Sequence, residues 1–175
     1  MRIEATIWPA SPTSFDRNGI ALILLDIAAC RAAARKEARE VLKNSAARLL
    51  GKAGIELIET PHGPRLDESG IHVSLSYVAD KALIGLSHAG PVGVDIVRIE
   101  PLPGIDALAK IYLPSCSVSS DADFALAWAR MEACCKALNL PLAEIDDERK
   151  NAYAGCDLPE CMQIDGYRMA VALAA

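Results

Sequence analysis

The chain has 175 residues, of which 52% are hydrophobic and 23% charged, with a formal net charge of −5 at pH 7. This length and composition predict one compact folded unit and exclude a disordered chain or a modular multidomain enzyme. The acidic balance disfavours generic binding to nucleic acid or to an anionic membrane. Apolar runs such as that from Ile20 to Leu25 are much shorter than the roughly 20 residues that span a bilayer, so no membrane span is expected.

The cysteines and the start of the chain indicate a reducing compartment. Six cysteines include no C-x-x-C pair and lie mostly in apolar, helix-like sequence. Buried, reduced thiols are therefore expected, and zinc is not, because His72 and His88 have no ligand-like spacing from them. Residues 1–11 contain Glu4 and Pro9 and no continuous apolar segment, so we expect no secretory signal and a cytoplasmic protein.

The first half predicts a strand, a long helix and then antiparallel strands. Ile20 to Ile27 is a branched apolar run typical of a buried strand. From Arg31 to Leu50, apolar residues recur every three or four positions, which predicts an amphipathic helix that Gly51 closes. Further strands are expected at 55–58, 71–77 and 82–86, with a loop at 61–64.

The second half predicts a similar order of elements. A strand is expected at 92–99, followed by an irregular, Pro-rich and Ser-rich connection at 100–120. A second amphipathic helix is expected from Asp121, as its N-cap, to Leu138. Residues 161–174 favour a hairpin that turns at Asp165–Gly166.

The repeated order predicts an α+β fold with two similar halves related by a pseudo-twofold axis. The expected halves are residues 1–90 and 91–175, divided at Gly90–Pro91. Unrelated α+β arrangements fit the same order of elements. In duplicated folds, ligands commonly bind between the halves.

Two carboxylates stand out as candidates for chemistry. Asp95 lies inside an apolar strand, where burial is costly unless a cation or hydrogen bonds compensate. Glu132 and Lys136 are four residues apart on the second helix and share one face; taken alone, this spacing fits an ordinary surface ion pair. Together, a strand carboxylate and a helix carboxylate suit Mg²⁺, which completes its shell with water and substrate phosphates, and Lys136 could neutralise a phosphate.

Four segments carry a family resemblance. Residues 91–96 (PVGVDI) and 128–138 (WARMEACCKAL) resemble the paired signature of the 4′-phosphopantetheinyl transferases, G-V-D-I and W-x-x-K-E-A-x-x-K-A. Residues 63–66 (GPRL) resemble the family's Gly-Lys/Arg-Pro stretch, and residues 73–77 (VSLSY) stand where the family has S-L-S-H-S. The segments occur in the family's order and cover residues 63 to 138.

The resemblance implies a 4′-phosphopantetheinyl transferase-like fold and an activity. The enzymes transfer 4′-phosphopantetheine from coenzyme A to a serine of an acyl, peptidyl or polyketide carrier protein and release adenosine 3′,5′-bisphosphate. A carboxylate, or water held by one, would accept the serine proton. The duplicated layout also implies a monomer. The implied residues are Asp95 and Glu132 as magnesium ligands, Asp95, Glu132 and Lys136 as catalytic groups, and Arg65, Ser76, Tyr77 and Lys136 as the coenzyme A site.

Departures from the signature leave alternatives open. Met131 stands where the family has the first lysine of K-E-A, and Tyr77 stands where it has histidine. One alternative is a catalytically weak or silent relative that binds coenzyme A or a carrier protein as a scaffold. Another is a metal-free interaction module in which Asp95 and Glu132 make structural hydrogen bonds. A Ser-His-Asp hydrolase and a P-loop or dinucleotide enzyme are not expected, because the sequence has no G-x-S-x-G, Walker A or G-x-G-x-x-G pattern.

Overall fold

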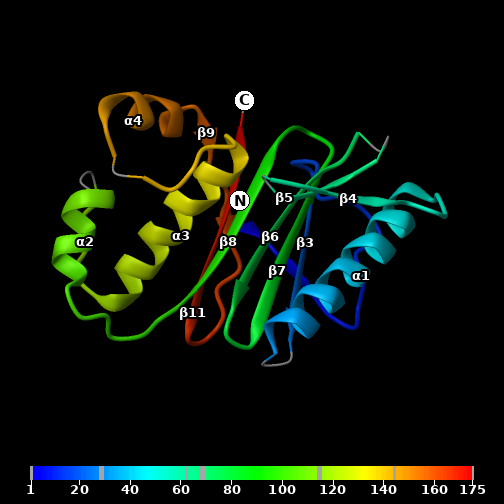
Figure 1. Ribbon diagram of the computed structural model, residues 1–175, viewed down its shortest axis with the longest axis horizontal. Coiled ribbons are helices and arrows are strands. Elements are labelled where there is room, and N and C mark those ends of the chain that lie inside the picture. Colours follow the sequence, from blue (N-terminus) through cyan, green and yellow to red (C-terminus); the bar gives the residue numbers. More distant parts are fainter. Residues whose placement is uncertain are drawn as a thin grey trace.

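The protein has an α+β fold (Figure 1). The computed structural model describes residues 2–27, 30–61, 63–67, 70–113, 116–143 and 145–174. Over these ranges, no helix is both long enough and apolar enough to cross a membrane.

The elements follow the chain in two groups. Up to residue 87 they are β1 (Arg2–Ile3), β2 (Ala5–Ile7), β3 (Ile20–Asp26), α1 (Arg31–Leu50), β4 (Leu57–Thr60), β5 (Gly63–Leu66), β6 (His72–Val78) and β7 (Lys81–Ser87). After it they are β8 (Val92–Arg98), α2 (Ile105–Tyr112), α3 (Asp121–Ala137), α4 (Asp147–Ala154), β9 (Cys156–Asp157), β10 (Glu160–Cys161) and β11 (Tyr167–Ala174).

Two sheets form the framework. The four-stranded sheet has the order β2-β3-β7-β6, and the three-stranded sheet has the order β8-β11-β9. Two small pairs, β1 with β10 and β4 with β5, lie outside them. In the three-stranded sheet β8 runs antiparallel to β11, with Asp95 opposite Ala170. Strands β6 and β8 are edge strands, one from each sheet.

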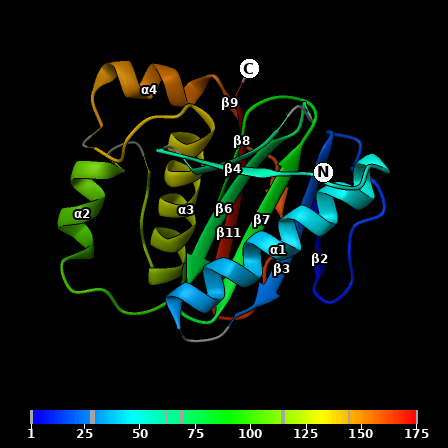
Figure 2. The same cartoon turned by 45° about the vertical axis from the view of Figure 1, so that its right-hand side comes forward.

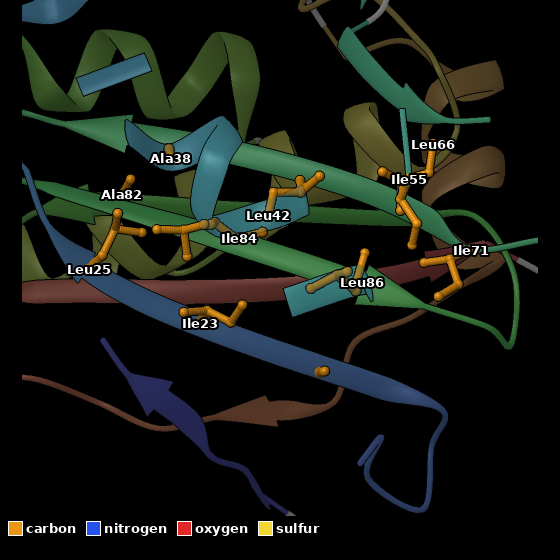
Figure 3. Close-up of a cluster of buried hydrophobic side chains, with 13 residues drawn as sticks. Ile23, Leu25, Ala38, Leu42, Ile55, Leu66, Ile71, Ala82, Ile84 and Leu86 are labelled. Atoms are coloured by element: carbon orange, nitrogen blue, oxygen red, sulfur yellow. The ribbon is translucent and has the colours of Figure 1, made fainter. Parts of the chain in front are cut away.

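Helix α1 covers one face of the four-stranded sheet. The periodic residues Ala38, Val41, Leu42 and Ala46 are all buried in its core-facing side. Figure 3 shows this cluster, in which Leu42 lies among Ile23, Ile84 and Leu86 of the strands. The helix ends where Gly51 adopts a left-handed conformation with φ of 60°, which a glycine accepts without a steric penalty.

The two sheets share a second core, and α3 lies outside it. Alternate residues of β8 (Val92, Val94 and Ile96) join β3, β7 and β11 in one buried cluster. The other face of β8 and β11 packs against α3 through small side chains, including Ala129, Ala133, Ala170 and Ala172. Figure 2 shows α1 and α3 on different sides of the strands.

Gly93 allows α3 to approach β8 closely. A Cβ atom at this position would lie 1.9 Å from the carbonyl oxygen of Ala133 and 2.6 Å from the amide nitrogen of Ala137. Both neighbours are helix backbone, which cannot move aside without shifting the helix. The absence of a side chain at position 93 therefore sets the distance between the strand and the helix.

The structure corrects the expected helices in three places. The segment expected to be an irregular connection contains α2, and α4 was not expected. Each helix has only 8 residues, and α2 lies between Pro-rich and Ser-rich stretches that favour an irregular connection. The N-cap of α3 is Ser120, whose hydroxyl accepts from the amide of Asp123, and Asp121 is the first helical residue.

The structure also corrects the strands. Residues 57–60 and 63–66 pair as β4 and β5. The strand expected at 55–58 is therefore shifted to 57–60, and β5 replaces most of the loop expected at 61–64. Residue 62 lies outside the described residues. Gly166 does make a turn with φ of 78°. However, the arm of the expected hairpin before that turn, β10, pairs with β1, while β11 pairs with β8 and β9. The expected strands at 20–27, 82–86 and 92–99 are confirmed, each within about one residue.

We expect Gly93→Ala to lower the free energy of unfolding by about 3 kcal/mol or more, because the new methyl group overlaps helix backbone. Urea unfolding followed by circular dichroism measures the change. Gly155→Ala is the control, since its Cβ would approach Ala152 only to 3.3 Å. Equal stability of the two variants would contradict the close approach of β8 and α3.

Candidate active site

The alternation of β8 turns Asp95 toward α3. Val94 and Ile96 face the core between the sheets, so Asp95 lies on the opposite face with Gly93 and Val97. Its side chain is buried, with a relative exposure of 4%. A buried carboxylate requires compensation, and the structure provides it from two elements.

Asp95 accepts hydrogen bonds from β6 and from α3. Ser76 Oγ donates to Asp95 Oδ1 over 2.6 Å, and Lys136 Nζ donates to the same oxygen over 2.7 Å. Lys136 also donates to the carbonyl oxygen of Val94 over 3.0 Å. The lysine is thus fixed by two acceptors of one strand, which places its charge directly over the buried carboxylate.

Glu132 lies one helical turn before Lys136 and faces the same ammonium. Its Oε2 atom is 3.9 Å from Lys136 Nζ, and its Oε1 atom accepts a hydrogen bond of 2.7 Å from Trp128 Nε1. Trp128, Glu132 and Lys136 therefore follow one another at intervals of four residues along one face of α3. Glu132 and Lys136 therefore do not form an isolated surface ion pair, because Lys136 also donates to the buried carboxylate of Asp95.

Burial raises the pKa of Asp95 above its ordinary value, and the negative charge of Glu132 adds to this shift. The charge of Lys136 and the hydrogen bonds from Lys136 and Ser76 act in the opposite direction. The ionised form of Asp95 therefore depends on Lys136 more than on any other group around it.

Serine hydroxyls join β6 to β8. Ser74 Oγ accepts from the amide of Val94 over 3.0 Å, and Ser76 Oγ accepts from the amide of Ile96 over 3.3 Å. These side chains satisfy amides of an edge strand that would otherwise be buried without a partner. Ser76 thus holds the seam between the sheets and the Asp95 side chain at the same time.

Two cavities meet at Lys136. One has a volume of about 370 Å³, and its walls include Ser76, Asp95, Glu132 and Lys136. The other has a volume of about 500 Å³ and includes Arg65 and Lys136. The exposed side chain of Arg65 forms no ion pair with an acid in the described part of the chain. Lys136 thus borders both cavities, and Arg65 adds a second cation to the larger of the two.

The structure separates Tyr77 from this group. Tyr77 also borders the smaller cavity, but its side chain packs against the core under α1. Its hydroxyl is buried and has no hydrogen-bond partner among the described residues, and burial raises the pKa of this phenol. The nearby charges are those of Arg39, Arg35 and Glu59 rather than those of the Asp95 group.

Met131 also lies away from the carboxylates. It is 5% exposed and belongs to a buried cluster with Leu113, Phe124 and Cys135. Position 131 thus points to the side of α3 that bears α2 and α4. The charge that the family signature has at this position would not face Asp95 here.

The donor set fits a hard cation that is shared with a ligand. Within the described residues, no group of three or more His, Cys, Asp or Glu side chains could hold a metal ion. Asp95 Oδ2 receives no hydrogen bond from a described residue, and Glu132 Oε2 has only the distant ammonium. Two such oxygens are a donor set that suits Mg²⁺ when phosphate and water supply the remaining ligands.

Sequence reasoning missed two contributors to this site. The sequence predicts Trp128 as a helical residue but not its hydrogen bond to Glu132, although the spacing of four residues between them could have indicated it. Ser74 was part of the matched segment, yet its bond to β8 depends on a contact between sheets that no local pattern shows. Two exposed arginines, Arg31 and Arg98, also line the cavity of Asp95.

A scan of known protein families and a search of curated proteins both found no match to this chain.

We expect Lys136→Met to be strongly destabilising at high pH. The folded-state pKa of Asp95 is raised, so its contribution to the free energy of unfolding falls as pH rises from the unfolded to the folded pKa. Removal of Lys136 raises the folded pKa further and extends this fall to higher pH. The penalty should be about 3–5 kcal/mol at pH 8 and smaller at pH 5, because a larger fraction of Asp95 is protonated at the lower pH.

Urea unfolding in a chelating buffer at both pH values measures this difference. Lys43→Met is the matched control, because Lys43 forms an exposed pair with Glu40 at 3.8 Å, and such pairs contribute about 1 kcal/mol or less. A Lys136→Met penalty that is equal at pH 5 and pH 8 would contradict the dependence of Asp95 on Lys136.

We expect Met131→Lys to destabilise the protein by about 3 kcal/mol or more, because it buries an unpaired charge. Met131→Leu, which keeps the volume, should cost less than about 1.5 kcal/mol. Thermal unfolding of both variants measures the effect. Wild-type stability of Met131→Lys would mean that position 131 faces solvent or the carboxylate site.

Proposed function

We propose that the protein is a 4′-phosphopantetheinyl transferase, which moves phosphopantetheine from coenzyme A to a serine of an acyl, peptidyl or polyketide carrier protein. One observation carries the proposal: Asp95, Glu132 and Lys136 come from two elements yet meet in one cavity. They are the residues for which the sequence resemblance implies metal and phosphate binding.

The basic groups support recognition of coenzyme A. Lys136 lines both cavities, and Arg65 lines the second, so a bisphosphorylated nucleotide would find cations along the seam. An acidic protein requires such local cations to bind a polyanion. Ser76, held between Asp95 and the amide of Ile96, positions the carboxylate rather than the ligand. Tyr77 would contribute packing.

Asp95 and Glu132 would hold Mg²⁺ through the oxygens that Lys136 and Trp128 leave free. The ion would supply charge neutralisation at the transferring phosphate. In the transfer, the serine oxygen of the carrier forms a bond to the phosphorus next to pantetheine. The bond between that phosphorus and the bridging oxygen breaks, and adenosine 3′,5′-bisphosphate leaves. Glu132, half-buried at the cavity wall, is placed to accept the serine proton directly or through water.

The layout supports the remaining parts of the proposal. Each of the two larger sheets has one long helix on its outer face, α1 or α3, and their inner faces share a core. We propose that residues 1–90 and 91–175 are related by a pseudo-twofold axis. A chain that contains both halves would act as a monomer, and a carrier protein substrate implies a cytoplasmic location.

Incubation with coenzyme A, Mg²⁺ and a panel of apo-carrier proteins, followed by intact-mass measurement, tests the activity. We expect at least one carrier to gain the mass of phosphopantetheine. Glu132→Gln should slow this gain by about 10²- to 10⁴-fold, as expected for loss of an acid–base group. Glu148→Gln, which changes an exposed acid of α4, should leave the rate unchanged.

Calorimetry with coenzyme A separates the alternatives. Arg65→Gln should weaken binding by roughly tenfold, since a charge-assisted hydrogen bond contributes about 1.5–3 kcal/mol, whereas the exposed Arg48→Gln control should not. Binding of coenzyme A without transfer to any carrier would favour a silent scaffold. Absence of coenzyme A binding would favour a metal-free interaction module.

A further inference from the structure

A large cavity lies behind α3, on the side away from the carboxylates. It has a volume of about 650 Å³, within the range typical of small-molecule sites. Its walls come from α2, α3, α4 and the segments beside them. In Figures 1 and 2, α2 and α4 lie beyond α3 from the strands, so this space is separate from the cleft above β8.

The walls are mostly apolar and only partly covered. Leu126, Ala127 and Ile145 line the cavity and are half-buried, together with the aromatic ring of Tyr153. Neither α2 nor α4 has a fully buried residue. The cavity lies beside the cluster of Leu113, Phe124, Met131 and Cys135, against which α2 packs, and an apolar ligand would remove the remaining apolar surface of the walls from water.

The charged side chains that line the cavity carry about one positive charge in sum. Asp123 accepts hydrogen bonds from the hydroxyls of Ser119 and Ser120, which keep its carboxylate ionised, so Asp123, Arg130 and Lys150 together give the wall one net positive charge. Lys150 is 3.0 Å from Asp147. Arg130 lines the cavity and forms no ion pair with a described acid. One free guanidinium beside an apolar void is complementary to a ligand with a single negative charge.

We propose that this cavity binds an apolar chain that ends in one carboxylate, such as a fatty acid. The chain lies against α2, α3 and α4, and the carboxylate pairs with Arg130 at the rim, with Lys150 as a second cation on α4. A doubly charged phosphate head group would exceed the free positive charge. The buried thiol of Cys134 in the wall stays protonated, because burial raises its pKa to about 12.

Calorimetric titration of the full chain with dodecanoate, below its micellar concentration, tests the site. We expect saturable binding at one site and a raised melting temperature. Dodecyltrimethylammonium and dodecanol, which have the same chain with the opposite charge or none, should bind at least tenfold more weakly. Equal binding of dodecanol would overturn the carboxylate assignment.

Substitutions in the wall test where dodecanoate binds. Arg130→Gln should weaken dodecanoate binding roughly threefold to tenfold, as for an exposed ion pair, while Arg48→Gln should not. Ala127→Phe should abolish binding by filling the void, whereas Ala107→Phe on the exposed face of α2 should leave it unchanged. Leu126→Phe is the second filling variant if Ala127→Phe fails to fold.

The inference does not depend on the transferase proposal. Glu132→Gln, which should slow transfer and does not line this cavity, should bind dodecanoate as the wild type does. Lack of saturable binding in the wild type, or full binding in both filling variants, would overturn the site.

Discussion

The buried carboxylate of Asp95 is the constraint on which the rest of the structure depends. An ionised carboxylate that is 4% exposed is tolerable only where a cation and hydrogen-bond donors reach it together. The cation comes from α3 and the donor comes from β6. The seam between the sheets, the position of α3 and the candidate site are therefore consequences of one local electrostatic requirement.

Helix α3 serves two environments because its faces differ in kind. One face has Glu132 and Lys136, of which Lys136 bonds to Asp95 of β8. Another has Met131 and Cys135 in the cluster beneath α2 and α4. Small alanines between the faces let the helix lie close to β8 and β11. A ligand on either side would thus contact the same rigid element.

The sequence was most informative where local chemistry and tertiary packing agreed. Helix α1 matches its expected bounds because its apolar period is continuous and Gly51 adopts the required left-handed conformation. Asp95, Glu132 and Lys136 could be selected because a charge within an apolar strand and an acid–base pair at helical spacing are both local patterns.

It was least informative where contacts between distant elements decide the outcome. The resemblance implies Ser76 as part of the coenzyme A site, yet Ser74 and Ser76 are both buried and bonded to β8. The resemblance places Met131 where the family has a phosphate-binding lysine. A signature gives the order of residues, but it does not show which way a helix face points. Helices α2 and α4 escaped notice because each has only 8 residues, one within a Pro-rich and Ser-rich segment and the other in a mostly charged and polar stretch.

The pairing of β8 with β11 has a consequence for how the chain folds. Strands β6 and β7 are joined by a short turn and can pair early, whereas Arg98 and Tyr167 are distant in sequence yet opposite in the ladder. Long-range closure of this kind is slow relative to local pairing. Asp95 would therefore stay hydrated until β11 and α3 have docked, and the ion pair with Lys136 would form among the last contacts. In a refolding experiment, that pair would report completion of the native state rather than its nucleation.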